Sequence, residues 1–74
     1  SYTISLFRRG TAKIAQKVGE EGVEVVIEAM RGDDAAFRNE AADLLFHLLV
    51  LLVDRGVPWD EVVRVLEERH RTAD

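Results

Sequence analysis

Hydrophobic residues recur every three to four positions along most of the chain, which is typical of amphipathic helices. No segment alternates apolar and polar residues for long enough to indicate a strand. Gly10, Gly32 and Gly56 each follow a basic residue, as glycines at helix ends often do. The pattern predicts four helices, at residues 3–9, 11–31, 34–55 and 58–71. We therefore expect an all-α protein with a single domain, residues 1–74.

The predicted helices begin at residues suited to that position. Thr11, and either Asp33 or Asp34, offer side-chain oxygens that can accept hydrogen bonds from the first turns of the second and third helices. Pro58 is the only proline, and its missing N–H costs nothing in the first turn of the last helix.

The second predicted helix, residues 11–31, has more apolar surface than one neighbour could bury. On a helical wheel the hydrophobic positions occupy roughly 220°, leaving a narrow charged face. Gly19 and Gly22 fall inside the apolar sector, where each costs about 1 kcal/mol of helix propensity relative to alanine. We expect the close approach of another helix to compensate for that cost, which predicts a tight bundle.

The third predicted helix, residues 34–55, is apolar nearly all round, which favours a place at the centre of a bundle. Its narrow polar stripe includes Glu40, Asp43 and His47. A carboxylate that faces a protein interior must be paired, protonated or bound to a metal. Basic residues are few on this pair of helices, so the sequence favours a metal. His47 is either a hydrogen-bond donor or base next to that metal, or a buried histidine whose hydrogen bonds are satisfied.

Composition narrows the class of protein. The chain is 47% hydrophobic, too rich for disorder, and its lack of cysteine excludes disulfides and thiol redox catalysis. A net charge of −4 argues against binding to nucleic acid or to an anionic membrane. The densest apolar run, residues 44–53, includes His47 and is too short to cross a membrane. A domain of this size buries only about 60% of its unfolded surface, so we expect it to oligomerise. We also expect a cytoplasmic location.

Charge is distributed unevenly along the chain. The first 19 residues contain four basic residues and no acidic one, whereas residues 20–43 contain eight acidic residues and two basic ones. A basic segment next to an acidic one is what a site for a phosphate–metal complex requires. The alternative, a solvated face of mixed charge, is favoured by composition alone.

Two acidic pairs flank the predicted turn at Gly32. Glu21 and Glu24, like Glu40 and Asp43, are three residues apart and so share a helix face about one turn apart. Antiparallel packing would bring the pairs together, and carboxylates about 6 Å apart repel by about 3 kcal/mol at an effective dielectric near 20. Mg²⁺ or Mn²⁺ would relieve this repulsion with oxygen ligands. Neither pair has the histidine spacing of a carboxylate di-iron bundle.

The combined motif, Glu20-Glu21-x-x-Glu24 followed by Glu40-x-x-Asp43, resembles the signature of the all-α NTP pyrophosphohydrolases, the MazG-like superfamily. The segments 1–3, 10–21 and 40–51 are similar to the phosphoribosyl-ATP pyrophosphatase family, and the resemblance extends over residues 1–70. Two positions depart from that family's pattern. Gly22 stands where alanine is more frequent, and Phe46 replaces the usual tyrosine and so lacks a hydroxyl. Family members begin with a further helix upstream of Ser1, so the resemblance predicts that this chain is incomplete.

The resemblance implies hydrolysis of the α–β phosphate bond of 1-(5-phosphoribosyl)-ATP to phosphoribosyl-AMP and pyrophosphate, the second step of histidine biosynthesis. It also implies a homodimer with a shared helical bundle. Four carboxylates would hold Mg²⁺, which Mn²⁺ could replace: Glu21, Glu24, Glu40 and Asp43. One of two carboxylates would serve as general base: Glu20 or Glu24. Four basic side chains would bind phosphate: Lys13, Lys17, Arg8 and Arg9.

Other interpretations remain open at this point. Arg8 and Arg9 could simply be exposed to solvent, and the hydroxyls of residues 1–3 could contact ribose or phosphate or could cap a helix. A MazG-like house-cleaning enzyme would act on ordinary or damaged nucleoside triphosphates with the same metal chemistry. A helical interaction module without catalytic activity would carry the same acids as a solvated face.

Overall fold

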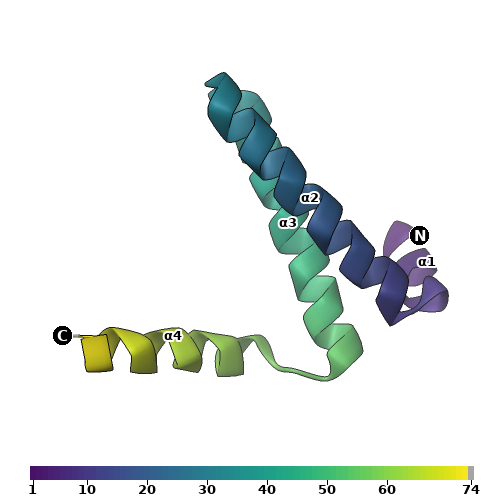
Figure 1. The fold of residues 1–74 in the computed structure, drawn as a ribbon. Helices are drawn as coiled ribbons and strands as arrows, with labels where there is room; N and C mark the ends of the chain where they lie inside the picture. The colour runs from purple at the N-terminus through teal and green to yellow at the C-terminus, as the bar shows by residue number, and fades with distance from the viewer. Residues whose placement is uncertain (74) are drawn as a thin grey trace.

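The computed structural model describes residues 1–73, which form four α-helices and no strand (Figure 1). The helices are α1 (Tyr2–Arg9), α2 (Thr11–Arg31), α3 (Asp34–Arg55) and α4 (Trp59–Ala73). The prediction of an all-α protein is confirmed, and the bounds of α2 and α3 are those predicted. Helix α1 begins one residue earlier than expected, and α4 begins one residue after Pro58. None of the described helices is long and apolar enough to span a membrane.

Helices α2 and α3 pack side by side as an antiparallel hairpin (Figure 1). Gly32 ends α2 with a φ of 82°, in the left-handed conformation that glycine adopts at little cost. The side chain of Asp33 then caps α3 by accepting hydrogen bonds from the backbone N–H groups of Ala35 and Ala36. The predicted helix stop and cap are both confirmed, so the sharp reversal between α2 and α3 is encoded locally.

Helix α1 packs on α2, and Gly10 joins them. The prediction that Thr11 caps α2 was wrong, because Gly10 occupies the cap position and Thr11 is already helical. The hydroxyl of Thr11 instead donates a hydrogen bond to Oδ2 of Asp54 at 2.5 Å. This bond ties the first turn of α2 to the last turns of α3.

The buried core is small. It consists of Leu6 from α1, Ile14 from α2 and Val50 from α3, with Leu51 packed against them. Large hydrophobic side chains remain exposed on every helix, and on α2 and α3 they include Val23, Val26, Ile27, Met30, Phe37, Leu45, Leu49 and Val53. The expectation that α3 lies at the centre of a bundle is therefore not met within a single chain, since α2 covers only one of its sides.

Gly19 and Gly22 face open space in this structure. A Cβ atom added at either position would meet no atom within 4 Å, so the close helix approach expected there does not occur within the chain. That expectation was wrong for the single chain because α3 packs on another side of α2.

The chain as a whole is extended, and α4 projects away from the hairpin with little contact to the other helices (Figure 1). Its radius of gyration is 14.4 Å, against about 11 Å for a compact domain of this length. Its accessible surface is 5522 Å², against about 4,600 Å² expected for a folded monomer of this mass. The chain is thus less compact than an independent domain.

Candidate metal centre

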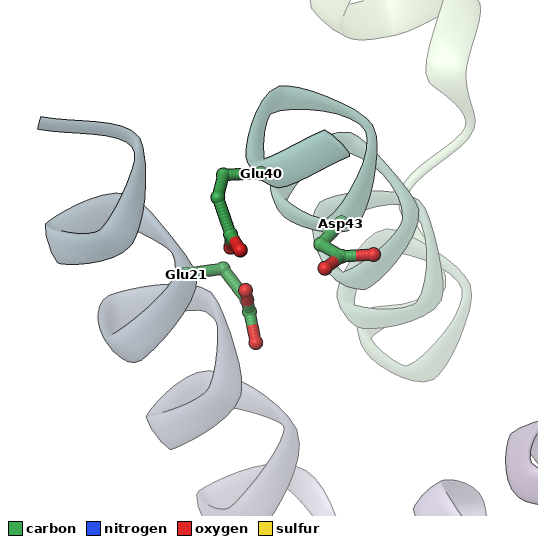
Figure 2. A group of neighbouring side chains, drawn as sticks. All are labelled: Glu21, Glu40 and Asp43. Carbon is green, nitrogen blue, oxygen red and sulfur yellow. The ribbon is translucent and has the colours of Figure 1, made fainter. Parts of the chain in front are cut away.

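Three acidic side chains converge where α2 passes α3 (Figure 2). Glu21 comes from α2, Glu40 and Asp43 come from α3, and one carboxylate oxygen of each lies within 4.8 Å of the other two. We call these residues the acidic triad. The antiparallel hairpin brings them together, as the spacing around the Gly32 turn predicts.

The pKa of Glu40 is raised above its ordinary value of 4.5. Partial burial is the largest cause, followed by the hydrogen bond with Glu21 and by the negative charges of Glu21, Asp43 and Glu24. All of these disfavour the ionised carboxylate. A bound cation would offset the same repulsion, which is why the arrangement suits a metal.

Glu24, the fourth predicted ligand, is exposed and lies outside the acidic triad. It follows Glu21 by one turn on α2 and is close enough for its charge to act on Glu40. A shallow depression of about 420 Å³ lies beside the triad, lined by Lys17, Glu20, Glu21, Val23 and Glu24. A larger hollow of about 700 Å³ runs along α4 and includes none of the predicted site residues.

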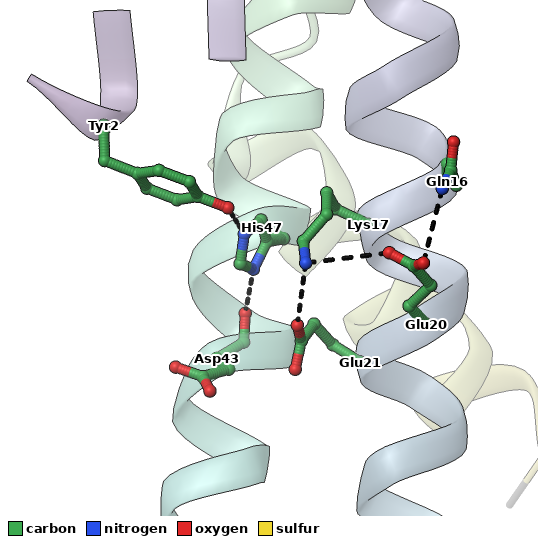
Figure 3. A network of polar contacts seen from close by, with 7 residues as sticks. All are labelled: Tyr2, Gln16, Lys17, Glu20, Glu21, Asp43 and His47. Atoms are coloured by element: carbon green, nitrogen blue, oxygen red, sulfur yellow. Dashed lines mark hydrogen bonds and ion pairs between the residues drawn. The ribbon is translucent and has the colours of Figure 1, made fainter. Parts of the chain in front are cut away.

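Lys17 pairs with two carboxylates at the edge of the acidic triad (Figure 3). Its Nζ lies 3.4 Å from an oxygen of Glu21 and 3.6 Å from an oxygen of Glu20. Partial burial acts to lower the pKa of Lys17, but the hydrogen bond with Glu21 and the electrostatic effects of Tyr2, Glu20 and Glu21 outweigh it. The pKa of Lys17 is therefore raised, and its ammonium group stays charged beside the triad.

Glu20 lies outside the acidic triad, and its contacts are with residues of its own helix. It accepts a hydrogen bond from Nε2 of Gln16 at 3.3 Å (Figure 3). This hydrogen bond is the main cause of a lowered pKa for Glu20, and the charges of Lys17 and Lys13 add to it against a smaller effect of desolvation. A carboxylate with a lowered pKa is a weaker base, which counts against Glu20 as the general base.

The other predicted phosphate-binding residues are farther from the acidic triad. Lys13 is half-buried one turn before Lys17 on α2. Arg8 and Arg9 are exposed in the last turn of α1. The chain continues from these two arginines into Thr11, whose hydroxyl is bonded to Asp54 near the end of α3. The arginines therefore lie at the opposite end of α1 from the triad.

His47 is buried, with 5% of its surface exposed, and lies one turn after Asp43 on α3. Its Nδ1 is 2.7 Å from the backbone oxygen of Asp43, and its Nε2 is 2.7 Å from the hydroxyl of Tyr2 (Figure 3). A carbonyl oxygen only accepts, so Nδ1 carries the proton and Nε2 of the neutral ring accepts from Tyr2. Both ring nitrogens are occupied, which agrees with the interpretation of a buried histidine whose hydrogen bonds are satisfied.

The contact between Tyr2 and His47 was missed at the level of sequence. The two residues are 45 positions apart, and no local pattern links the start of the chain to the middle of α3. The rings of Tyr2 and Phe46 stack with centroids 6.2 Å apart, and the rings of Tyr2 and His47 meet edge-on at 5.7 Å. For Ser1 the capping interpretation is confirmed, since its hydroxyl accepts from the N–H of Ile4.

Comparison with known proteins places these features in a family. Residues 1–70 match the family model for phosphoribosyl-ATP pyrophosphohydrolase. The phosphoribosyl-ATP pyrophosphatase of Azospirillum brasilense is 60% identical over 73 residues, which cover 99% of this chain and 66% of that relative. The phosphoribosyl-ATP pyrophosphatase of Rhizorhabdus wittichii is 55% identical over 73 residues, covering 99% of this chain and 69% of the relative.

A second kind of relative is longer. The histidine biosynthesis bifunctional protein HisIE of Vibrio parahaemolyticus is 58% identical over 71 residues, which cover 96% of this chain and 34% of that protein. The chain thus spans about a third of such bifunctional relatives and about two thirds of the shorter ones. Because the family model matches nearly the whole chain, the chain belongs to the phosphoribosyl-ATP pyrophosphohydrolase family.

Proposed function

We propose that this chain hydrolyses the α–β phosphate bond of 1-(5-phosphoribosyl)-ATP, giving phosphoribosyl-AMP and pyrophosphate in histidine biosynthesis. The observation that carries the proposal is the convergence of Glu21, Glu40 and Asp43 within 4.8 Å in a chain of this family. The names of two similar relatives, both phosphoribosyl-ATP pyrophosphatases, support the substrate. The acidic triad supports the chemistry, since a phosphoanhydride needs its negative charge neutralised before water can attack.

The acidic triad fits Mg²⁺, with Mn²⁺ as a substitute. Its three residues offer only carboxylate oxygens, the donors that these hard cations prefer, and no nitrogen or sulfur. Glu24, one turn from Glu21 on the same helix, would complete the set of four ligands. When bound, the cation would supply positive charge for the phosphate oxygens and orient a water molecule.

The basic residues of α2 would bind the triphosphate. Lys17 already lies beside the acidic triad, 3.4 Å from Glu21, so it would reach phosphate oxygens held there. Lys13, one turn earlier, would extend the same positive face. Arg8 and Arg9, at the far end of α1, would bind a phosphate distant from the scissile bond, such as the one on the added ribose.

We assign the general base to Glu24 rather than to Glu20, although both are exposed and line the depression beside the triad. The hydrogen bond from Gln16 holds the pKa of Glu20 below its ordinary value, which makes that carboxylate a weaker base. In the reaction the water oxygen bonds to phosphorus, the bridging P–O bond breaks, and pyrophosphate leaves with the bridging electron pair. Glu24 would accept the proton that the water loses.

We further propose that the working form is a homodimer. The chain exposes 5522 Å², about 900 Å² more than a folded monomer of its mass, which is close to the roughly 800 Å² that each partner buries in a standard interface. The exposed apolar faces of α2 and α3, and the open space at Gly19 and Gly22, are surfaces that a second copy would cover. A cytoplasmic location stays a prediction from the sequence.

The decisive experiment follows pyrophosphate release from phosphoribosyl-ATP, and separately from the common nucleoside triphosphates, with and without Mg²⁺. The proposal expects release that depends on Mg²⁺ and is specific for phosphoribosyl-ATP. Release mainly from ordinary triphosphates would instead assign the chain to the house-cleaning enzymes.

A binding assay separates the enzyme from an interaction module without catalytic activity. Mg²⁺ that binds only the folded chain raises its melting temperature. We expect this rise in the parent chain and not in the double variant Glu21→Ala, Asp43→Ala. Equal responses of the two proteins, including no response in either, would contradict the metal site.

A further inference from the structure

The hydroxyl of Tyr2 connects α1 to the helices that carry the acidic triad. It donates to Nε2 of His47 on α3 at 2.7 Å, and it lies within electrostatic range of Lys17 on α2. Tyr2, Lys17 and His47 therefore meet at one level of the three helices, next to the triad (Figure 3). Of the side-chain hydrogen bonds that α1 makes within the described residues, the one to His47 crosses to another helix.

The bond is well defined on the His47 side. The ring is buried and its Nδ1 is held by the backbone oxygen of Asp43 at 2.7 Å, so the ring cannot turn without leaving a buried polar atom unsatisfied. Phe46 and His47 also pack edge-on, with ring centroids 5.2 Å apart. The acceptor for Tyr2 is thus fixed in position and orientation.

We propose that Tyr2 and His47 are a positioning pair that fixes α1 against α3 and thereby places the basic side chains of α1 and the neighbouring Lys17 for the substrate phosphates. The inference rests on the proposed function. Neither residue touches the reacting atoms. Both ring nitrogens of His47 are hydrogen-bonded, and the hydroxyl of Tyr2 is hydrogen-bonded to His47. The pair determines the position of α1, whereas the acidic triad lies on α2 and α3.

The pair positions α1 and the triad lies on α2 and α3, so loss of the pair should change one kinetic constant and not the other. Contacts between phosphate and basic residues that are equally strong in the ground state and the transition state affect KM and not kcat. Tyr2→Phe removes the hydroxyl and keeps the ring stacked on Phe46. We expect it to raise KM for phosphoribosyl-ATP about tenfold, the cost of roughly one hydrogen bond, with kcat and the half-saturating Mg²⁺ concentration within about twofold.

Variants of His47 show which of its two hydrogen bonds matters. A glutamine amide reaches the position of Nε2 and can accept from Tyr2, whereas an asparagine amide reaches only the position of Nδ1. We therefore expect His47→Gln to keep KM near the parent value and His47→Asn to raise it as Tyr2→Phe does. The double variant Tyr2→Phe, His47→Asn should be no worse than Tyr2→Phe alone, because both changes remove one interaction.

Ser5→Ala is the matched control. It also deletes a hydroxyl from α1, but that hydroxyl donates to the backbone oxygen of Tyr2 within the same helix. KM should not change in this variant. An unchanged KM in both Tyr2→Phe and His47→Asn would overturn the proposal and leave only a packing role. A fall in kcat with a shifted Mg²⁺ requirement would also overturn it, since the pair would then act on the triad.

A spectroscopic measurement separates this proposal from the proposed function. Nitrogen-15 NMR of the His47 ring should show a protonated Nδ1 and an unprotonated Nε2 in the parent chain, with the Nε2 resonance shifted in Tyr2→Phe. A proton on Nε2 of the neutral ring would overturn the pairing, whatever the enzyme assay gives. If the parent chain releases no pyrophosphate although the NMR result is as expected, the proposed function fails and the pairing stands without its kinetic role.

Discussion

Lys17 on α2 places its ammonium nitrogen 3.4 Å from a carboxylate oxygen of Glu21, one member of the acidic triad. The same nitrogen is 3.6 Å from Glu20, so one positive charge serves two acids of its own helix. The protein therefore supplies part of the charge neutralisation that a divalent cation would otherwise provide alone. Lys17 and the cation should consequently compete for Glu21.

Lys17→Met tests that competition. Without the ammonium group the acidic triad should bind Mg²⁺ more tightly, by about threefold to tenfold, because a like charge has been removed from its edge. KM for phosphoribosyl-ATP should rise at the same time, because a phosphate contact has been lost. Isothermal titration with Mg²⁺ and steady-state kinetics measure the two effects separately. Weaker Mg²⁺ binding in the variant would show that Lys17 supports the site rather than competing for it.

Glu40→Gln tests the acidic triad itself. The amide is close to the carboxylate in size but carries no charge, so turnover should fall on the order of 100-fold or more as metal binding is lost. The fold should persist by circular dichroism, because Glu40 takes no part in the core of Leu6, Ile14 and Val50. Glu67→Gln, which removes an exposed acid from α4, is the matched control and should retain activity. Retained activity in Glu40→Gln would exclude the assigned metal site.

The sequence predicted most of the hairpin because its determinants are local. Gly32 and Asp33 end one helix and cap the next within a few residues, and the spacing of Glu21, Glu40 and Asp43 follows once those two helices are antiparallel. Each of these features depends on residues close together in the chain or on the helical repeat. No long-range information is needed to place the acidic triad.

What the sequence did not predict depends on contacts between distant residues. Thr11 looked like a cap, but its hydroxyl is used by Asp54, 43 residues away. Tyr2 was one of three residues with hydroxyls at the start of the chain, yet its hydroxyl is hydrogen-bonded to His47, 45 residues away. In both cases a polar side chain had several possible partners, and only the packing of α1 and α2 against α3 selects one.

The raised pKa of Glu40 predicts an unusual dependence of stability on pH. Below the ordinary value of 4.5 the group is protonated in both the folded and the unfolded chain and contributes nothing. As pH rises above 4.5, the unfolded chain loses this proton before the folded chain does, so the contribution of Glu40 to stability falls until its raised pKa is passed. At neutral pH the ionised Glu40 therefore lowers the stability of the folded chain, because partial burial and the neighbouring acids disfavour its charge.

Glu40→Gln should therefore raise the melting temperature of the metal-free chain at pH 7 and have little effect below pH 4.5. Thermal unfolding in a chelating buffer across this pH range makes the measurement. Addition of Mg²⁺ at pH 7 should reverse the order, because the parent then gains from binding and the variant does not. A variant that is less stable than the metal-free parent at pH 7 would show that Glu40 is not under strain from its neighbours.

The exposed apolar face of α2 predicts the behaviour of a dimer variant. Val26 and Met30 are 62% and 83% exposed in the single chain, on a helix whose other side packs on α3. Val26→Asp places a charge on that face and should convert a dimer to a monomer by sedimentation, since an unpaired charge is costly in an apolar interface. Ala12→Asp adds the same charge at an exposed position in the first turn of α2 and should leave the mass unchanged. A parent chain that sediments as a monomer near 8.4 kDa would contradict the proposed homodimer.

Gly22 gives the most direct test of what lies on the open side of α2. A Cβ atom at this position meets nothing within 4 Å in the single chain. Gly22→Ala should therefore stabilise the chain by up to about 1 kcal/mol, the difference in helix propensity between the two residues. Gly32→Ala is the matched opposite, because Gly32 has a φ of 82° and alanine there would be strained.

Denaturant unfolding at several protein concentrations separates the effect on the helix from an effect on association. If Gly22→Ala raises stability equally at all concentrations, α2 gains helix propensity and no second chain comes close at this position. If it lowers stability most strongly at high concentration, where the dimer is populated, the second copy packs closely on Gly22, and the cost of this glycine is offset in the dimer interface.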